Sequence, residues 1–436
     1  MPKVCIIGAG STVFATQLMT DILLTPALKR GTFALVDIDA ERLELAQRMA
    51  EYLIARSGRD WQVESSQDRR SVLEDSDYVV STIEVAGLQN VRHDYDIPLK
   101  YGVDQCIGDS MGPGGLFKAL RTLPAWLDIL EDIERLAPRA MVLNYTNPML
   151  SMVQAGLRAS LLPVVGLCHS MQHTSHQLAG YLDMPYDDLE WEGAGTNHLN
   201  WFLRLEHKGQ DLYPRLRERA RLPEVYDQDA VRFETMRQLG AFASESSGHQ
   251  SEYLPYYRKR PDLLQAFDRG GYRGESGFYA NNWPTWRANG DAKLRRVLAG
   301  EEEYEMQRSD EYAADIMEAL AGGQPAVIYG NVLNNGLIDN LPRSGVVEVA
   351  CRVDEMGLNP QHYGVLPSQL AALNCQHMNY HELVAAAILE QQREAAVHAL
   401  MIDPLTAAVC SLAEIRQMFD EMVAAQKAYL PEFLFY

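Results

Sequence analysis

The sequence predicts an α/β fold, with a doubly wound parallel sheet in the first half of the chain and a mixed α/β unit in the second. Short apolar runs alternate with helical patterns in the first half, which is typical of parallel strands that helices cover on both faces. A glycine turn follows the first of these runs. From about residue 193 the pattern changes to hairpins and longer helices.

Five apolar runs in the first half are expected to be buried strands. The segments between them, for example 40–57 and 115–136, have helical periodicity. The runs are KVCIIG (3–8), FALVD (33–37), YVVSTI (78–83), MVLNY (141–145) and VVGLC (164–168).

The second half begins with an expected hairpin, whose turn lies near Lys208 and Gly209. Residues 244–300 are rich in Tyr, Trp, Gly and Arg but weakly periodic, which predicts a long irregular segment of functional type. The remaining elements are helices at 229–239 and 309–321, two or three strands around an Asn-Gly turn at 325–354, and a long helical tail at 368–425.

Composition limits the class of protein. The chain has 436 residues, of which 47% are hydrophobic, enough for a large core and two structural units. A formal net charge of −20 excludes nucleic acid as a partner, because a polyanion is repelled. Six irregularly spaced cysteines predict reduced thiols. Without a signal peptide or an apolar stretch of membrane-span length, we expect a cytoplasmic protein with no membrane partner.

The glycine turn indicates dinucleotide binding. Gly8 suits a tight turn, and Gly10 lets a pyrophosphate approach the backbone at a helix N-terminus, where Ser11 and Thr12 can donate further hydrogen bonds. Asp37 ends the second strand, where an acidic residue accepts from the ribose 2′-hydroxyl and favours NAD over NADP. We therefore expect a Rossmann-type NAD-binding domain at residues 1–195 and a catalytic, substrate and oligomerisation domain at 196–436.

Two features weaken the glycine signal. Val13 occupies the position of the third glycine in the usual fingerprint, so this position must pack differently against its surroundings. The alternative to a cofactor site is a plain glycine turn, with Asp37 capping the following helix.

Several polar stretches lie at strand ends or in loops on the side where doubly wound sheets bind ligands. They are GDSMGPGG (108–115), NYTNPM (144–149), CHSMQ (168–172), GTNHLNW (195–201) and ESSGHQSEYLPYY (245–257). A thiolate and an imidazole suit a divalent transition metal. Residues alone favour Cys168 as an ordinary core thiol, because free cysteines are among the most buried side chains.

These motifs, taken in order, resemble glycoside hydrolase family 4, the NAD-dependent glycosidases. The resemblance runs nearly end to end through IIGAGST, GPGG, NYTNPM, CHS, NH, VIYGNV and DPLTAAV. CHSMQ is similar to the CHSVQ form of bacterial α-galactosidases of the melibiase type. The resemblance implies hydrolysis of a small-molecule α-galactoside with NAD and Mn²⁺. It also implies a second domain of lactate/malate dehydrogenase-like type and a homo-oligomer, either a dimer or a tetramer.

The family mechanism that the resemblance implies is a redox-assisted elimination. NAD takes a hydride from C3 of the sugar, and the ketone acidifies the proton on C2. A base removes that proton, the metal stabilises the enolate, and the aglycone leaves from C1. Water then adds and the hydride is returned. A carbonyl held on a metal makes abstraction of a C–H proton feasible.

The resemblance also assigns roles to individual residues. Cys168 and His198 correspond to the metal ligands. His169 stands where some relatives have an aspartate that protonates the leaving group, and Asp109 is a second candidate for the acid or for substrate contact. Asn147 corresponds to an asparagine that contacts sugar hydroxyls, with capping of the following helix as its alternative role.

The base that removes the C2 proton is left open by the sequence. The family uses a tyrosine or an aspartate within the stretch that matches 245–257, and this chain offers His249, Glu252 and Tyr253 there. His249 aligns with the tyrosine, as base or third metal ligand, and Tyr253 is the alternative base.

Other functions share part of this pattern. A dehydrogenase of the lactate or malate type has the same architecture, but it needs no metal and no CHS segment. An NAD-sensing binding protein needs no set such as Cys168, His198, Asn147 and Asp109. Within the family, an α-galacturonidase or an α-glucosidase is the nearest alternative. Arg92, Arg121 and Arg258 are candidates to bind the carboxylate of a uronate.

Overall fold

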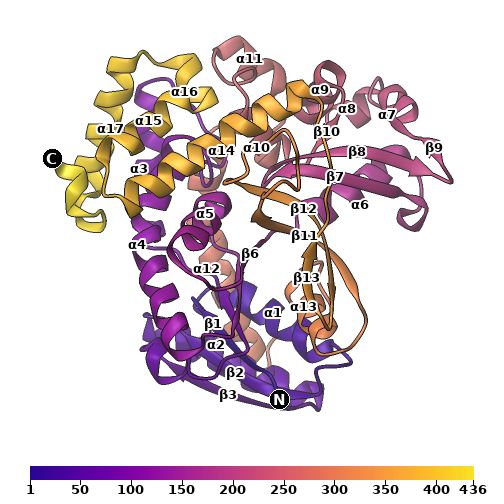
Figure 1. The fold of residues 1–436 in the computed structure, drawn as a ribbon, viewed down its shortest axis with the longest axis vertical. Helices are drawn as coiled ribbons and strands as arrows, with labels where there is room; N and C mark the ends of the chain where they lie inside the picture. The colour runs from indigo at the N-terminus through magenta and orange to yellow at the C-terminus, as the bar shows by residue number, and fades with distance from the viewer.

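Six parallel strands form one half of a sheet in the computed structural model, which describes residues 1–436 (Figure 1). They are β1 (Lys3–Ile7), β2 (Arg30–Val36), β3 (Asp60–Ser66), β4 (Tyr78–Ser81), β5 (Met141–Asn144) and β6 (Val164–Leu167). Their order is β3-β2-β1-β4-β5-β6, and all neighbouring pairs run parallel. This is the strand order of doubly wound dinucleotide-binding folds, so the predicted fold class is confirmed.

Both faces of this parallel sheet are buried, as the apolar runs predict. Successive residues of β1 alternate between two hydrophobic cores: Cys5 and Ile7 belong to one, and Val4 and Ile6 to the other. The connecting helices are α1 (Thr12–Leu24), α2 (Ala40–Ser57), α3 (Gly87–Lys100), α4 (Gly112–Leu136), α5 (Met149–Ala159) and α6 (Ser170–Leu182).

Strand β3 has no counterpart in the sequence prediction. Its sequence is DWQVESS, and only Trp61 in it is buried. Because β3 is the last strand of the sheet and pairs only with β2, it needs little apolar side chain to form. A strand of this kind gives a weak hydrophobic signal.

The sheet continues into the second half of the chain through antiparallel strands, beginning where β11 pairs with β6. These strands are β7 (Glu190–Thr196), β8 (Leu199–His207), β9 (Gln210–Asp211), β10 (Phe242–Ala243), β11 (Ala326–Leu333), β12 (Val346–Asp354) and β13 (Gly357–Pro360). The turn at Lys208 and Gly209 joins β8 to β9, and 325–354 holds β11 and β12 around an Asn-Gly turn, as predicted. The division of the chain at residue 195 stays a prediction.

The helices of the second half contradict one expectation. Residues 244–300 are largely helical rather than irregular, and α12 alone spans 21 residues. Helix α12 has a weak amphipathic pattern because only Ala280, Leu294 and Val297 are buried in it. The helices are α7 (Tyr213–Arg219), α8 (Pro223–Tyr226), α9 (Ala230–Leu239), α10 (Ser247–Tyr253), α11 (Pro261–Phe267), α12 (Phe278–Leu298), α13 (Ala313–Leu320), α14 (Ser368–Leu389), α15 (Arg393–Ile402), α16 (Pro404–Val409) and α17 (Leu412–Gln426).

The predicted helical tail is four helices, α14 to α17, which pack over α3, α4 and α5 (Figure 1). Residues 410 and 411 separate α16 from α17, and Ser411 and Glu414 form a reciprocal N-terminal cap on α17. All six cysteines carry free thiols. No helix combines the length and the hydropathy that crossing a bilayer requires.

Candidate active site

A cavity of about 1090 Å³ lies at the carboxyl ends of the parallel strands and extends under the second half of the chain. Thr82, Asn147 and Cys168 line it just beyond β4, β5 and β6 respectively. His198 lines it from the turn between β7 and β8, and His249 from α10. The cavity therefore lies between the carboxyl ends of the parallel strands and side chains of the antiparallel half. Doubly wound folds bind ligands at this end of their parallel strands.

Cys168 and His198, which are 30 residues apart in the chain, meet at this cavity with Sγ and Nε2 separated by 3.5 Å. His198 occupies a left-handed turn position with φ 59°, a conformation that non-glycine residues adopt rarely and often at functional sites. Its Nδ1 lies 3.1 Å from the Tyr253 hydroxyl oxygen. A proton on Nδ1 donated to that oxygen leaves Nε2, the atom facing Cys168, free to bind a metal.

The electrostatic setting suits this pair to a cation. Burial, and then the neighbouring His249, lower the pKa of His198 to about 4, so its imidazole is neutral and its lone pair is available. Burial raises the pKa of the Cys168 thiol, and Glu348 adds to the effect. A divalent ion reverses such a shift, because a coordinating thiol is deprotonated.

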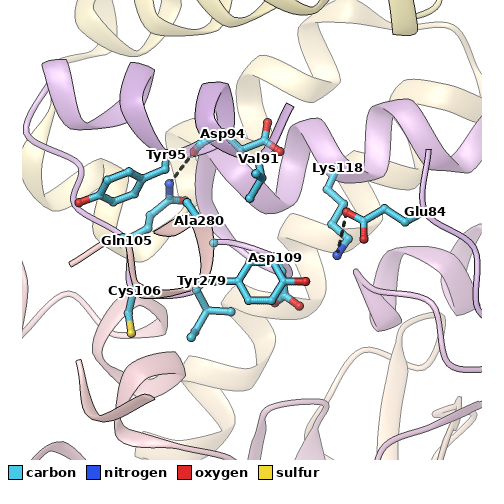
Figure 2. A pocket seen from close by; sticks show the side chains of 13 residues that line it. Glu84, Val91, Asp94, Tyr95, Gln105, Cys106, Asp109, Lys118, Tyr279 and Ala280 are labelled. Carbon is cyan, nitrogen blue, oxygen red and sulfur yellow. Dashed lines mark hydrogen bonds and ion pairs between the residues drawn. The ribbon is translucent and has the colours of Figure 1, made fainter. Parts of the chain in front are cut away.

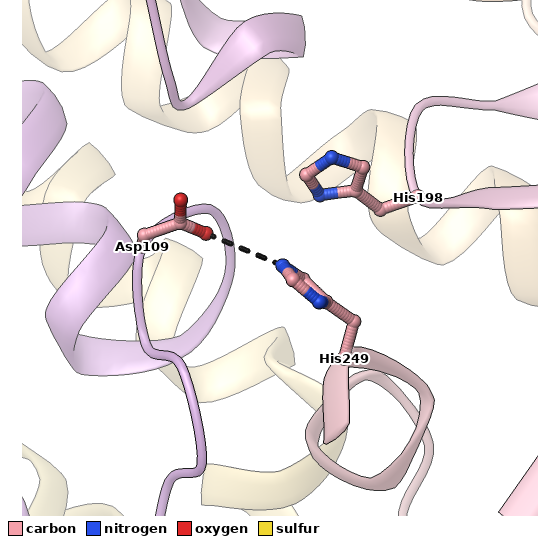
Figure 3. Close-up of side chains that lie close together, drawn as sticks. All are labelled: Asp109, His198 and His249. Atoms are coloured by element: carbon pink, nitrogen blue, oxygen red, sulfur yellow. Dashed lines mark ion pairs between the residues drawn. The ribbon is translucent and has the colours of Figure 1, made fainter. Parts of the chain in front are cut away.

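His249 and Asp109 complete a tight group with His198 (Figure 3). Their candidate ligand atoms all lie within 4.8 Å of one another. His249 Nε2 lies 3.7 Å from Asp109 Oδ1 and, although it is buried, it makes no hydrogen bond. Asn147 donates its side-chain N–H to Asp109 Oδ2 over 3.0 Å. A buried, unpartnered imidazole nitrogen beside a carboxylate and a second imidazole fits the donor set of a metal or a proton-transfer site.

Glu245 is a cavity residue that the sequence analysis missed. Its carboxylate lies 2.5 Å from His249 Nδ1, and its backbone has φ 77°. Burial lowers the pKa of His249, but Glu245 and Asp109 outweigh that effect and raise it well above the usual value. Although burial raises the pKa values of Asp109 and Glu245, His249 brings both below their usual range. Asp109 is therefore an anion here, a state that suits a ligand or a hydroxyl acceptor better than an acid.

The three candidates from 245–257 occupy different surroundings. His249 lines the cavity, whereas Glu252 and Tyr253 do not. Glu252 accepts from the backbone N–H groups of Cys106, Ile107 and Gly108, and so fixes the loop that carries Asp109. Tyr253 is 1% exposed and orients His198. Of the three, His249 is the side chain positioned to reach a ligand.

His169 lies at the rim of the same cavity, with a side chain that is 54% exposed. Its Nδ1 lies 2.8 Å from Glu311 Oε1. This hydrogen bond raises the pKa of His169 against the opposing effect of burial. A partly exposed imidazole that holds its proton suits an acid at the leaving-group side. Glu311, more than 140 residues away in sequence, had no signal of its own.

The glycine turn has the geometry of a cofactor site. Gly8 has φ 92°, and a side chain there would meet the Thr82 backbone oxygen at 2.7 Å. A Cβ on Gly10 would lie 2.4 Å from Asp37, which accepts from the Gly10 N–H over 2.7 Å. Ser11 lines the cavity, and its side chain does not cap α1. The turn therefore leaves the helix N-terminus open to an anion.

The alternative role of Asp37 as a helix cap is wrong, because Asp39 caps α2 by accepting from the backbone N–H groups of Glu41 and Arg42. The alternative role of Asn147 is also wrong. Helix α5 begins at Met149 without a side-chain cap, and the Asn147 side chain turns to Asp109 instead.

Lys118 is a third residue that the sequence analysis missed. It lines the large cavity and also a small neighbouring one of about 20 Å³, where Figure 2 shows it beside Glu84. Its Nζ lies 3.4 Å from Glu84 Oε1, and it helps to hold Asp109 ionised. Lys118 comes four residues after Gly114 in α4, and its side chain is buried there.

The three arginines that were considered for binding a uronate carboxylate bind other residues instead. Arg121 pairs with Asp94 over 2.8 Å and Arg258 with Asp104 over 3.1 Å, both in the interior. Arg92 lies at the surface with Asp96 and Asn281. None of the three lines the cavity.

Comparison with known proteins identifies the family of this chain. A model described as family 4 glycosyl hydrolase matches residues 3–184, and one for the family 4 glycosyl hydrolase C-terminal domain matches residues 193–406. An α-galactosidase of Bacillus subtilis (strain 168) is 39% identical over 439 residues, which cover 99% of this chain and all of that protein. An α-galactosidase of Rhizobium meliloti (strain 1021) is 35% identical over 438 residues, covering 99% of this chain and 89% of that one.

A solved structure shares the fold. The 6-phospho-β-glucosidase of Thermotoga maritima, with manganese, NAD⁺ and glucose-6-phosphate, is 21% identical and has a TM-score of 0.80, covering 98% of this chain and 99% of that one. At this identity the likeness extends to the fold alone. The two family models together span most of the sequence, and the two α-galactosidases align over nearly its whole length. The chain therefore belongs to the family 4 glycosyl hydrolases.

Proposed function

We propose that this family 4 hydrolase is an α-galactosidase that uses NAD⁺ and a divalent metal ion such as Mn²⁺. The observation that carries the proposal is the meeting of Cys168 and His198 at the end of β6, in a cavity that Ser11 of the glycine turn also lines. Full-length similarity to two α-galactosidases supports the choice of sugar.

The donor set fits a metal. Cys168 Sγ and His198 Nε2 would hold it, and Asp109 and His249 stand within reach of the same point. The glycine turn and Asp37 would hold NAD⁺, with Ser11 at the cavity wall. When bound, these groups supply a hydride acceptor and a Lewis acid, and family 4 enzymes are exceptions to the two-carboxylate route of glycoside hydrolysis.

The chain's own residues divide the remaining work. Asn147 and Asp109 offer an amide and a carboxylate to sugar hydroxyls. His249 faces the cavity with Glu245 behind its Nδ1, the arrangement that serves a general base, and we assign removal of the C2 proton to this pair. A metal ion bound at Cys168 and His198 would lower the pKa of the neighbouring His249 imidazole. His249 would then be free to accept that proton. His169, held by Glu311, is placed to protonate the leaving group.

The cavity favours a neutral sugar over a uronate or a sugar phosphate. Its lysine and arginine side chains are Lys118, Arg232 and Arg273. Lys118 is paired with Glu84, and Arg232 is buried against Asp229. An anionic substrate needs a free guanidinium or ammonium group facing it, and of these three only Arg273 makes no ion pair.

A panel of aryl glycosides tests the proposal. With NAD⁺, Mn²⁺ and a thiol reductant present, we expect hydrolysis of the α-galactoside at a kcat/KM at least about tenfold above that of the α-glucoside and the α-galacturonide, which is a difference of about 1.4 kcal/mol. Preference for the galacturonide would contradict the neutral-sugar argument. Inactivity on all three would contradict the proposed activity itself.

The hydroxyl of Tyr253 should matter to the metal although it does not line the cavity. Tyr253→Phe removes the hydrogen-bond partner of His198 Nδ1 and should weaken Mn²⁺ binding about 10- to 100-fold, measured by titration calorimetry under reducing conditions. Tyr257→Phe is the matched control, because this buried hydroxyl bonds Thr235 away from the cavity. Unchanged affinity in Tyr253→Phe, or an equal loss in Tyr257→Phe, would refute the orienting role.

Two further properties belong to the proposal. We expect the protein to act in the cytoplasm, which accords with six free thiols. We also expect a homo-oligomer, a dimer or a tetramer.

A further inference from the structure

Helix α12 returns from the second half of the chain to the glycine turn and packs against α1 and α2 (Figure 1). Its contact is close, because a Cβ on Gly290 would lie 2.6 Å from Val13. Val13 stands at the third-glycine position of the fingerprint, so this position faces α12. Asp291 follows directly, and its carboxylate accepts from the Thr12 hydroxyl over 2.5 Å. Thus α12 brings an anion to the first turn of the dinucleotide-site helix.

The Asp291 carboxylate forms an ion pair with Arg42 of α2. The two Nη atoms of Arg42 donate to the two carboxylate oxygens of Asp291, and its Nε donates to the Gly10 carbonyl over 2.6 Å. Both side chains are mostly buried, at 14% and 18% exposure. All three nitrogens of this guanidinium therefore donate a hydrogen bond, and its charge is neutralised beside the glycine turn.

Two backbone N–H groups hold the Asp37 carboxylate at the glycine turn. One of its oxygens accepts from the Gly10 N–H over 2.7 Å and the other from the Asp39 N–H over 2.9 Å. In dinucleotide sites of this class, an acidic residue here binds a ribose 2′-hydroxyl, whereas a nearby arginine accommodates the 2′-phosphate of NADP. This chain has both residues, five positions apart, so Asp37 alone does not decide between the two cofactors.

We propose that Asp291 sets the preference for NAD⁺ over NADP⁺ by binding Arg42 and so denying a 2′-phosphate its counter-ion. This inference rests on the proposed use of a dinucleotide. With Asp291 in place, a 2′-phosphate faces Asp37, Asp39 and Asp291 while Arg42 is already paired. Without it, Arg42 has two free Nη groups in the planar geometry that binds phosphate.

Binding measurements on the whole protein test the inference, with dissociation constants of NAD⁺ and NADP⁺ obtained by titration calorimetry. Asp291→Ala should bind NADP⁺ at least tenfold more tightly than the wild type and NAD⁺ within threefold of it. Asp291→Asn, which can still accept from Thr12, should shift the ratio in the same direction and keeps the test valid if the alanine variant loosens α12. The double variant Arg42→Ala/Asp291→Ala should lose the gain.

Glu41 provides the matched control. It is an exposed acid on α2 that also binds α12, accepting from Arg295 over 2.6 Å, and Glu41→Ala should leave the ratio unchanged. An unchanged ratio in both Asp291 variants, or an equal shift in Glu41→Ala, overturns the inference. A gain that survives in the double variant overturns the role of Arg42 and points to Arg287, a half-buried guanidinium nearby that makes no ion pair. A wild type that binds neither dinucleotide overturns the proposed cofactor as well.

Discussion

Cys168→Ser should lower kcat/KM for an aryl α-galactoside by at least about 100-fold and remove bound Mn²⁺. The loss should exceed the 10- to 100-fold cost of changing residues that merely support a ligand, because a hydroxyl replaces the soft thiolate of the proposed ligand set. The fold should persist. Cys168 lies at a strand end and makes one side-chain contact within hydrogen-bond range, with His198, so the free energy of unfolding should change by less than about 1 kcal/mol.

Cys375→Ser is the control for this variant. Cys375 is also a partly exposed free thiol, but it lies on α14 beside Asn379 and does not line the cavity. Activity assays, metal analysis and thermal unfolding should separate the two variants. If Cys168→Ser retains both its metal and its activity, the metal assignment fails.

Removal of the dinucleotide should abolish activity, with a loss of more than about 100-fold that NAD⁺ restores. The reason is that Asp109 and Glu245, the two carboxylates beside His249, are both held as anions, their pKa values lowered by His249 although burial raises them. Neither is therefore in the state of the acid in a two-carboxylate mechanism. During turnover NADH should not accumulate, since the hydride is returned to the sugar.

Absorbance at the NADH band, recorded alongside sugar release, checks this expectation. NADH rising in proportion to product would indicate an ordinary dehydrogenase. Full activity after exhaustive removal of the cofactor would exclude its participation.

Much of the fold could be predicted from the sequence because buried parallel strands consist mostly of apolar residues. The five expected strands are all present, and they point Cys168 and Asn147 into the cavity. Strand β3 was not predicted because it is an edge strand with polar residues. Helix α12 was not predicted because few of its residues are buried. Hydrophobic periodicity reports burial, so elements that bury little give little signal.

The site could be predicted only where a motif carried it. Cys168 and His198 stand in recognisable motifs, and the structure brings them together, although their roles stay predictions. Glu245, Lys118 and Glu311 were missed because their positions depend on contacts between distant segments. Glu245 lies in a quoted motif, yet only its left-handed backbone and its contact with His249 mark it out. Asp291 could not be expected at the glycine turn, since nothing local predicts that α12 returns there.

The central claim is that hydrolysis passes through proton removal at C2 of the sugar, by the His249–Glu245 pair, and not through displacement at C1. Hydrolysis of an aryl α-galactoside in D₂O, followed by mass spectrometry and NMR of the released galactose, tests this claim most directly. A carboxylate pair acts at C1 and leaves the C2 hydrogen in place. We expect deuterium at C2 of the product, a slower reaction of the C2-deuterated substrate, and loss of the exchange in His249→Ala. Galactose released without C2 deuterium, together with no rate effect of C2 deuteration, would contradict the account.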